Sequence, residues 1–186
     1  MKLKIICCLV LYCIFYSSVQ AQKEKAKFHL IETGGITIGE SEINAVFQTI
    51  NGVSFSNWFF GAGFGVDFYQ YKTLPLFFDA RNFFGRNHKW FLYGDLGYNF
   101  PLYNKSDKEI FYSGTYDLKG GVYTDFGFGI KTPLVKHSSL YFSLGHSYKQ
   151  LQGKYGISPL CVGCETSFYN YKFGYGRIIA KAGIGF

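Results

Sequence analysis

Beyond its first residues, this sequence lacks any apolar run approaching the length of about 20 residues that a membrane-spanning helix needs. It is also poor in methionine and proline, with one Met and four Pro in 186 residues. Aromatic residues and glycine are instead abundant, with 16 Tyr, 21 Phe and 23 Gly. Because aromatic residues favour strands and glycine favours turns, this composition indicates a β protein. A helical membrane protein is therefore excluded, and a soluble secreted protein or a membrane barrel remains.

The first 21 residues have the three parts of a secretory signal peptide. Residues 1–4 contain two lysines, residues 5–16 form an apolar run, and residues 17–21 end on a small side chain. The apolar run is too short to cross a bilayer as a helix. We expect cleavage after Ala21. The remaining domain, residues 22–186, then has 17 basic and 12 acidic residues, a net charge of +5.

Cysteine usage is also informative about the compartment. Cys7, Cys8 and Cys13 lie in the leader, and none follows the Leu-small-small pattern of a lipid-attachment cysteine, so a lipoprotein is not favoured. Cys161 and Cys164 remain in the exported chain, where a disulfide is the default in an oxidising compartment. Their spacing also fits a redox dithiol or half a zinc site, but a strand-to-helix context and a second ligand pair are not evident. We therefore predict a loop disulfide and no metal site.

Side-chain alternation predicts membrane-spanning strands. Along residues 57–71, every second position from Trp58 to Phe68 is apolar, which is enough for the about 9 to 11 tilted residues that span a bilayer. Residues 177–186 repeat the pattern, with charged residues only on the second face. Six further segments alternate in the same way: 27–38, 43–55, 74–85, 89–101, 117–131 and 139–151. The sequence thus predicts an all-β fold, a transmembrane antiparallel up-and-down β-barrel of eight strands.

The second face of these strands carries Gly, Tyr, Asn and isolated charges, which suits a narrow lumen better than the solvated face of a soluble sandwich. By parity, seven charged residues point into the lumen: Asp67, Asp79, Arg81, Asp95, Asp125, Arg177 and Lys181. An unpaired charge there would be costly, so we expect a network of hydrogen-bonded ion pairs. The network either lines a gated polar path or plugs the barrel. Because eight strands leave room only for side chains, we favour the plug.

Connections alternate in length between the two predicted rims. Short turns near residues 56–57, 85–88 and 132–137 indicate a periplasmic rim, and long polar segments at 102–116 and 152–167 indicate extracellular loops. The remaining outer connections, near residues 39–41 and 72–73, are short exceptions.

The long loops offer aromatic contact area for an extracellular surface ligand. It would come from Tyr103, Phe111, Tyr112, Tyr116 and Tyr155, together with the Cys161–Cys164 segment. Lysines expected near the outer rim suit the phosphates of lipopolysaccharide: Lys105, Lys108, Lys149, Lys154 and Lys172. Nucleic acid is a poor partner for a membrane-embedded surface.

At this point the chain resembles the small outer-membrane β-barrels of the OmpX and OmpA-transmembrane type. The resemblance is carried by the eight alternating segments and by residues 48–52, 74–81 and 184–186. It implies an outer-membrane location and recognition of a C-terminal signal, here Ile184 and Phe186, by the barrel-assembly machinery. Lys181 departs from that signal, which often has Gly at this position. The family contains structural anchors, adhesins and a few lipid-modifying enzymes, so the resemblance indicates location rather than activity.

The candidate catalytic residues do not form an evident site. His146 and Ser147 are adjacent and so lie on opposite strand faces, while His137 and Ser139 fall at a turn. No catalytic residue or cofactor is predicted. The leading hypothesis is a non-enzymatic outer-membrane barrel with a plugged lumen and a structural or adhesin-like role through its outer loops. The alternatives are a narrow channel for ions or small solutes and a lipid A-modifying acyl hydrolase, which would depend on His146 or Ser139.

Overall fold

The computed structural model describes residues 26–186 apart from 41, 103–113, 136–137 and 158–166. For residues 114–117, 135 and 155–157 it describes the backbone alone. Several predicted features therefore lie outside the described residues: the signal peptide, Cys161, Cys164, Tyr103, Phe111, Tyr112, Lys105, Lys108 and the side chains of Tyr116 and Tyr155.

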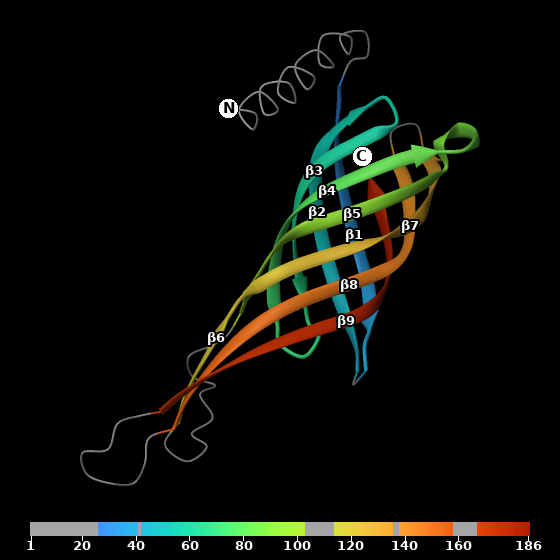
Figure 1. Cartoon of the computed structure of the whole chain (residues 1–186). Helices are drawn as coiled ribbons and strands as arrows, with labels where there is room; N and C mark the ends of the chain where they lie inside the picture. Colours follow the sequence, from blue (N-terminus) through green and yellow to red (C-terminus); the bar gives the residue numbers. More distant parts are fainter. Residues whose placement is uncertain (1–25, 41, 103–113, 136–137, 158–166) are drawn as a thin grey trace, which may run out of the picture.

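The described chain forms one antiparallel sheet that closes on itself (Figure 1). Its strands are β1 (Lys27–Ile38), β2 (Ile43–Phe55), β3 (Trp58–Asp67), β4 (Thr73–Phe84), β5 (Trp90–Pro101), β6 (Gly114–Lys119), β7 (Gly121–Val135), β8 (Ser138–Ile157) and β9 (Ser167–Gly185). A short 3-10 turn, η1 (Arg86–His88), joins β4 to β5. Both β6 and β7 pair with β8, so they occupy one place in the wall. The prediction of an eight-stranded up-and-down barrel is therefore confirmed.

Closure of the barrel joins the first and last strands. Ile31 lies opposite Gly185, and the pairing of β1 with β9 continues to Ile38 opposite Ile178. We call the rim with the β2–β3, β4–β5 and β7–β8 connections the turn end, and the opposite rim the loop end. At the turn end, Gly85 has a φ of 77°, a conformation that glycine adopts without strain.

The last two strands are longer than the alternation predicts. β8 continues to Ile157, and β9 begins at Ser167, in register with it, rather than near residue 177. With β6, these residues form a three-stranded extension beyond the loop end, visible in Figure 1, which we call the outer ribbon (114–119, 149–157 and 167–175). The ribbon is rich in lysine, glutamine and glycine and does not keep an apolar face. Its sequence therefore lacks the alternation that identified the other strands, and much of it was predicted as loop.

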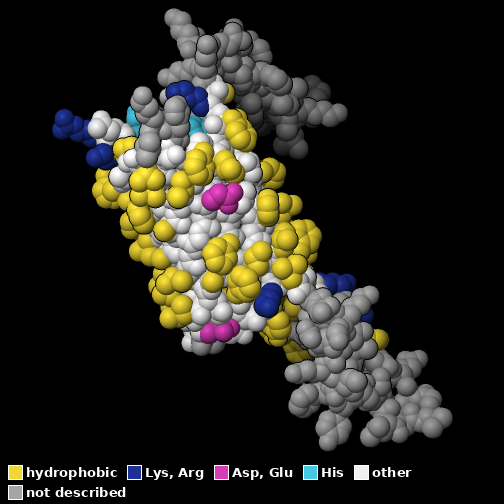
Figure 2. Space-filling view, turned by 180° about the vertical axis from the view of Figure 1, so that it is seen from behind, with side chains coloured by type: hydrophobic (Ala, Val, Ile, Leu, Met, Phe, Trp, Pro, Cys, Tyr) yellow, Lys and Arg dark blue, Asp and Glu magenta, His cyan; other side chains and the backbone are white. Residues whose placement is uncertain are grey.

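Side chains on the outside of the wall are mainly large and apolar. Phe28 is 68% and Phe78 76% exposed, and similar side chains recur around the barrel, as Figure 2 shows for one face. Such a belt suits contact with lipid rather than water. Within the part of the chain that the structure describes, no helix has the length and apolarity needed to span a membrane.

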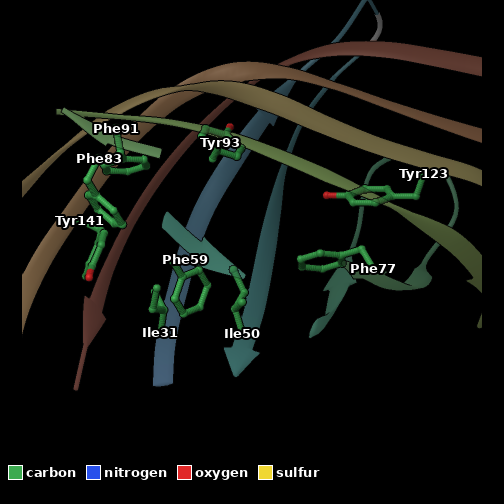
Figure 3. Packing of buried hydrophobic residues seen from close by; sticks show 9 residues of the cluster. All are labelled: Ile31, Ile50, Phe59, Phe77, Phe83, Phe91, Tyr93, Tyr123 and Tyr141. Carbon is green, nitrogen blue, oxygen red and sulfur yellow. The ribbon is translucent and has the colours of Figure 1, made fainter. Parts of the chain in front are cut away.

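The inner face holds an aromatic and aliphatic cluster (Figure 3). Phe91 packs against Phe83 and Tyr141, with ring centroids 5.6 and 5.8 Å apart, and Phe77 packs against Tyr123 at 5.6 Å. Ile31, Ile50, Phe59 and Tyr93 complete the cluster. These rings fill an interior that, in an eight-stranded barrel, is only wide enough for side chains.

Candidate functional site

Buried charges inside the barrel form the most concentrated polar site of the described chain. Eight residues make up what we call the lumen network, and none is more than 5% exposed: Asp67, Asp79, Asp95, Asp125, Arg81, Lys149, Arg177 and Lys181. The structure thus places all seven predicted lumen charges inside and adds Lys149. Four carboxylates face four cations, so the network is formally neutral.

The level nearest the turn end consists of two residues of β4. Arg81 and Asp79 are two positions apart and so lie on the same face of the strand. Arg81 Nε lies 3.0 Å from both carboxylate oxygens of Asp79, and Nη2 lies 2.9 Å from Oδ2. Aromatic rings of the core cluster surround the guanidinium, with centroids 5.5 Å (Phe91) and 5.8 Å (Tyr141) away. This charge pair is therefore enclosed by the aromatic cluster.

The middle level centres on Lys181 of β9. Its Nζ lies 2.7 Å from Asp125 Oδ2, 3.6 Å from Asp95 Oδ2 and 3.1 Å from Gln48 Oε1. Tyr93 donates to the other oxygen of Asp125 at 2.8 Å. Asp95 lies directly opposite Asp125 in the strand pairing and also opposite Asp79 of the first level. Three aspartates thus cross three neighbouring strands, and Lys181 and Arg81 offset their charge.

The level nearest the loop end joins β3, β8 and β9. Arg177 Nη1 lies 2.6 Å from Asp67 Oδ2, and Nη2 lies 2.8 Å from Ser147 Oγ. Lys149 Nζ lies 3.4 Å from Asp67 Oδ1. It also donates to the backbone oxygens of Tyr69 at 2.5 Å and Tyr71 at 3.0 Å. Lys149 thereby ties the β3–β4 connection to the inside of the barrel.

The Tyr69 ring packs against the two cations of this level. Its ring centroid lies 5.1 Å from the Arg177 guanidinium and 5.9 Å from Lys149 Nζ. Its hydroxyl reaches the β1–β2 connection, where it occupies the space that a side chain at Gly39 would need. The Tyr69 ring and the two cations therefore lie together at the loop end of the lumen.

Sequence reasoning placed Lys149 near lipopolysaccharide, and this was wrong. Its side chain is fully buried in the lumen, because position 149 has the same parity as the inward Ser147. Position 149 lies within the predicted strand 139–151, so the alternation rule that identified the other seven charges applies to Lys149 as well. The lysine was instead assigned to the outer rim because it lies near the loop end of that strand. Lys154 and Lys172 are exposed on the outer ribbon, as expected.

The predicted C-terminal signal lies at the seam between β9 and β1. Phe186 and Leu30 exchange backbone hydrogen bonds, with N–O distances of 2.9 and 3.2 Å. The side chains of Ile184 and Phe186 face outward. Lys181, which departs from the family pattern, faces inward and binds Asp125. Its place in the lumen network accounts for a charged residue in this strand.

Of the residues considered for acyl hydrolysis, His137 lies outside the described residues, and the others do not come together. His146 is on the outside of the wall, with its ring 5.5 Å from that of Phe126, whereas Ser147 is inside and bound to Arg177. Ser139 is on β8 near the turn end, seven positions from His146. Among the described residues, no group of three or more His, Cys, Asp or Glu side chains is placed to hold a metal ion.

No protein-family model matches the chain, and no curated protein matches it. Among solved structures, the chain is similar to the outer membrane protein AlkL in lipid bilayers, with 13% identity over 87% of both chains and a TM-score of 0.44. The outer membrane protein OprG from Pseudomonas aeruginosa has 12% identity, covers 87% of this chain and 96% of its own, and gives a TM-score of 0.41. The translocator domain of the autotransporter NalP from Neisseria meningitidis has 12% identity over 100% and 97% of the two chains, with a TM-score of 0.20. Because the identities and TM-scores are this low, the barrel assignment rests on this chain's own strand pairing.

Proposed function

We propose that this protein is an integral outer-membrane β-barrel whose lumen is plugged and whose outer ribbon and loops make contacts at the cell surface. The apolar belt of the wall supports a membrane location. The predicted signal peptide and the C-terminal Phe186 favour export and insertion by the barrel-assembly machinery. An OmpX-like or OmpA-like assignment is consistent with the eight strands and remains part of this proposal.

The observation that carries the proposal is the neutral, buried lumen network. A conducting pore needs a continuous water-filled path, whereas here three successive levels of ion pairs and rings cross the interior. Opening the path would separate buried opposite charges, and leaving one of them unpaired costs about 3 to 5 kcal/mol. The interior therefore rigidifies the barrel rather than conducting ions.

The outer ribbon supports the surface-contact role. Phe168, Tyr169 and Tyr171 are about half exposed on β9, and Lys154 lies 4.2 Å from the centroid of the Phe168 ring. Aromatic and basic side chains that project past the membrane boundary suit contact with the phosphates and sugars of lipopolysaccharide or with an extracellular ligand. This surface supports the proposed adhesin-like role.

Conductance in a planar bilayer tests the plug. The wild-type protein, Asp79→Ala and Arg81→Ala would be purified in detergent, checked for barrel fold by circular dichroism, and inserted at equal concentration. We expect no steady current from any of the three. A steady wild-type current that either substitution alters would contradict the proposal and make the barrel a narrow channel instead.

A further inference from the structure

An acidic side chain faces outward from the apolar wall. Glu32 of β1 points away from the lumen and is exposed, and its nearest outward neighbours along the strand are Leu30 and Gly34. Across the sheet it lies opposite Thr49 and Ile184. Thr49 donates a hydrogen bond to Glu32 Oε2 at 2.6 Å. Figure 2 shows that acidic side chains are few on the barrel face it draws and that apolar side chains predominate there.

Glu32 lines a hollow of about 610 Å³ on the outside of the barrel. The hollow lies over β9, β1, β2 and β3. It forms there because small residues such as Gly34 and Ala182 face outward and leave space between larger side chains. The sides are formed by Phe47, Phe64 and Phe186, which stand out from the wall. The hollow is thus apolar around a single carboxylate, and its size fits parts of a lipid rather than one ion.

Within the part of the chain that the structure describes, the charge of Glu32 has no counterpart. Among the described residues, no Lys, Arg or His forms an ion pair with it, and the four basic residues of the lumen network are on the other side of the wall. A carboxylate that faces the hydrocarbon region is unfavourable unless a cation or a donor reaches it. Thr49 supplies one donor and leaves the charge uncompensated.

We infer that this hollow binds a phospholipid with a primary ammonium headgroup, such as phosphatidylethanolamine. The ammonium would pair with Glu32, and an acyl chain would lie against Phe47 and Phe64 over the small residues. Phosphatidylglycerol and lipopolysaccharide offer no cation to the carboxylate, and their phosphates repel it. A second copy of the chain in a two-fold arrangement would bring two Glu32 carboxylates together. The inference rests on the membrane location proposed above.

The test is lipid retention by the full protein. Wild type and Glu32→Gln would be reconstituted into vesicles of equal parts phosphatidylethanolamine and phosphatidylglycerol, extracted in mild detergent, and analysed by native mass spectrometry. We expect wild type to retain phosphatidylethanolamine in preference to phosphatidylglycerol. The preference should fall about fivefold in Glu32→Gln, since one interfacial charge contributes about 1 kcal/mol. Gln keeps the size and the hydrogen-bond acceptor of Glu, so the fold should be unaffected.

A matched control comes from the second outer hollow, of about 590 Å³, which is lined by His146 on the wall formed by β5, β7, β8 and β9. His146→Gln should leave the lipid preference unchanged. Equal retention of both lipids by wild type, an unchanged preference in Glu32→Gln, or a dimer that Glu32→Gln dissociates would each overturn the inference. Failure of the protein to float with the vesicles would instead contradict the membrane location itself.

Discussion

Arg177 of β9 and Asp67 of β3 meet inside the barrel, with Nη1 2.6 Å from Oδ2, although 110 residues separate them in the chain. Their strands are not neighbours, because β1 and β2 lie between them in the wall. This ion pair therefore ties together parts of the barrel that no backbone hydrogen bond joins. Asp67 also faces Lys149, so one carboxylate serves two buried cations.

Asp67→Ala should destabilise the barrel by about 3 to 5 kcal/mol, because it leaves two buried cations without a partner. The measurement is urea-induced unfolding in lipid vesicles, followed by tryptophan fluorescence. The triple variant Asp67→Leu, Lys149→Met and Arg177→Met removes all three charges and should recover most of the loss. If Asp67→Ala is as stable as wild type, the ion pair does not support the fold.

Lys149→Met should loosen the β3–β4 connection more than it weakens the barrel. The ammonium donates to the backbone oxygens of Tyr69 and Tyr71, and hydrogen bonds of this charged kind contribute about 1.5 to 3 kcal/mol. We expect amide hydrogens of residues 69–72 to exchange at least about tenfold faster, since 1.4 kcal/mol is a factor of ten. Lys154→Met, on the outer ribbon, is the control and should leave these rates unchanged. If Lys149→Met and Lys154→Met show the same amide exchange rates at residues 69–72, Lys149 does not hold this connection.

Strand parity carried most of the sequence prediction. Because side chains alternate strictly between lipid and lumen, the inward positions of Asp67, Asp79 and Arg177 follow from counting residues. The ion pairs do not follow from the sequence. Which carboxylate meets which cation depends on the register and curvature of the closed barrel. Lys149 was misplaced because its position near the loop end of the predicted strand 139–151 was given more weight than its parity. Glu32 was not singled out from the sequence, because its parity places it on the outer face, away from the predicted lumen charges. Its place in an apolar hollow becomes visible only in the folded barrel.

Two glycines of β5 offer a test of packing in the wall. A side chain on Gly97 would overlap the backbone oxygen of Leu76 and the backbone of Phe77, whereas nothing lies within 4 Å of a Cβ built on Gly94. Gly97→Ala should therefore cost about 1 to 3 kcal/mol of unfolding free energy. Gly94→Ala should be neutral or stabilise by up to about 1 kcal/mol, because it restricts the unfolded chain. Equal effects in the same urea titration would contradict the close approach of β4 to Gly97.

The outer ribbon should bind lipopolysaccharide through its exposed lysines. Lys154 and Lys172 occupy neighbouring strands at the loop end, two residues apart in register, since Gln152 lies opposite Lys172 and Lys154 opposite Asn170. Lys154→Gln combined with Lys172→Gln should weaken binding of purified lipopolysaccharide, measured by calorimetry in detergent. Each lysine near an anionic surface contributes about 1 kcal/mol, so the double variant should lose about 30-fold in affinity. The difference from wild type should shrink as salt rises, because screening acts on exposed charges. Lys27→Gln, at the turn end, is the control, and a loss as large in that variant would assign the binding to overall charge rather than to the ribbon.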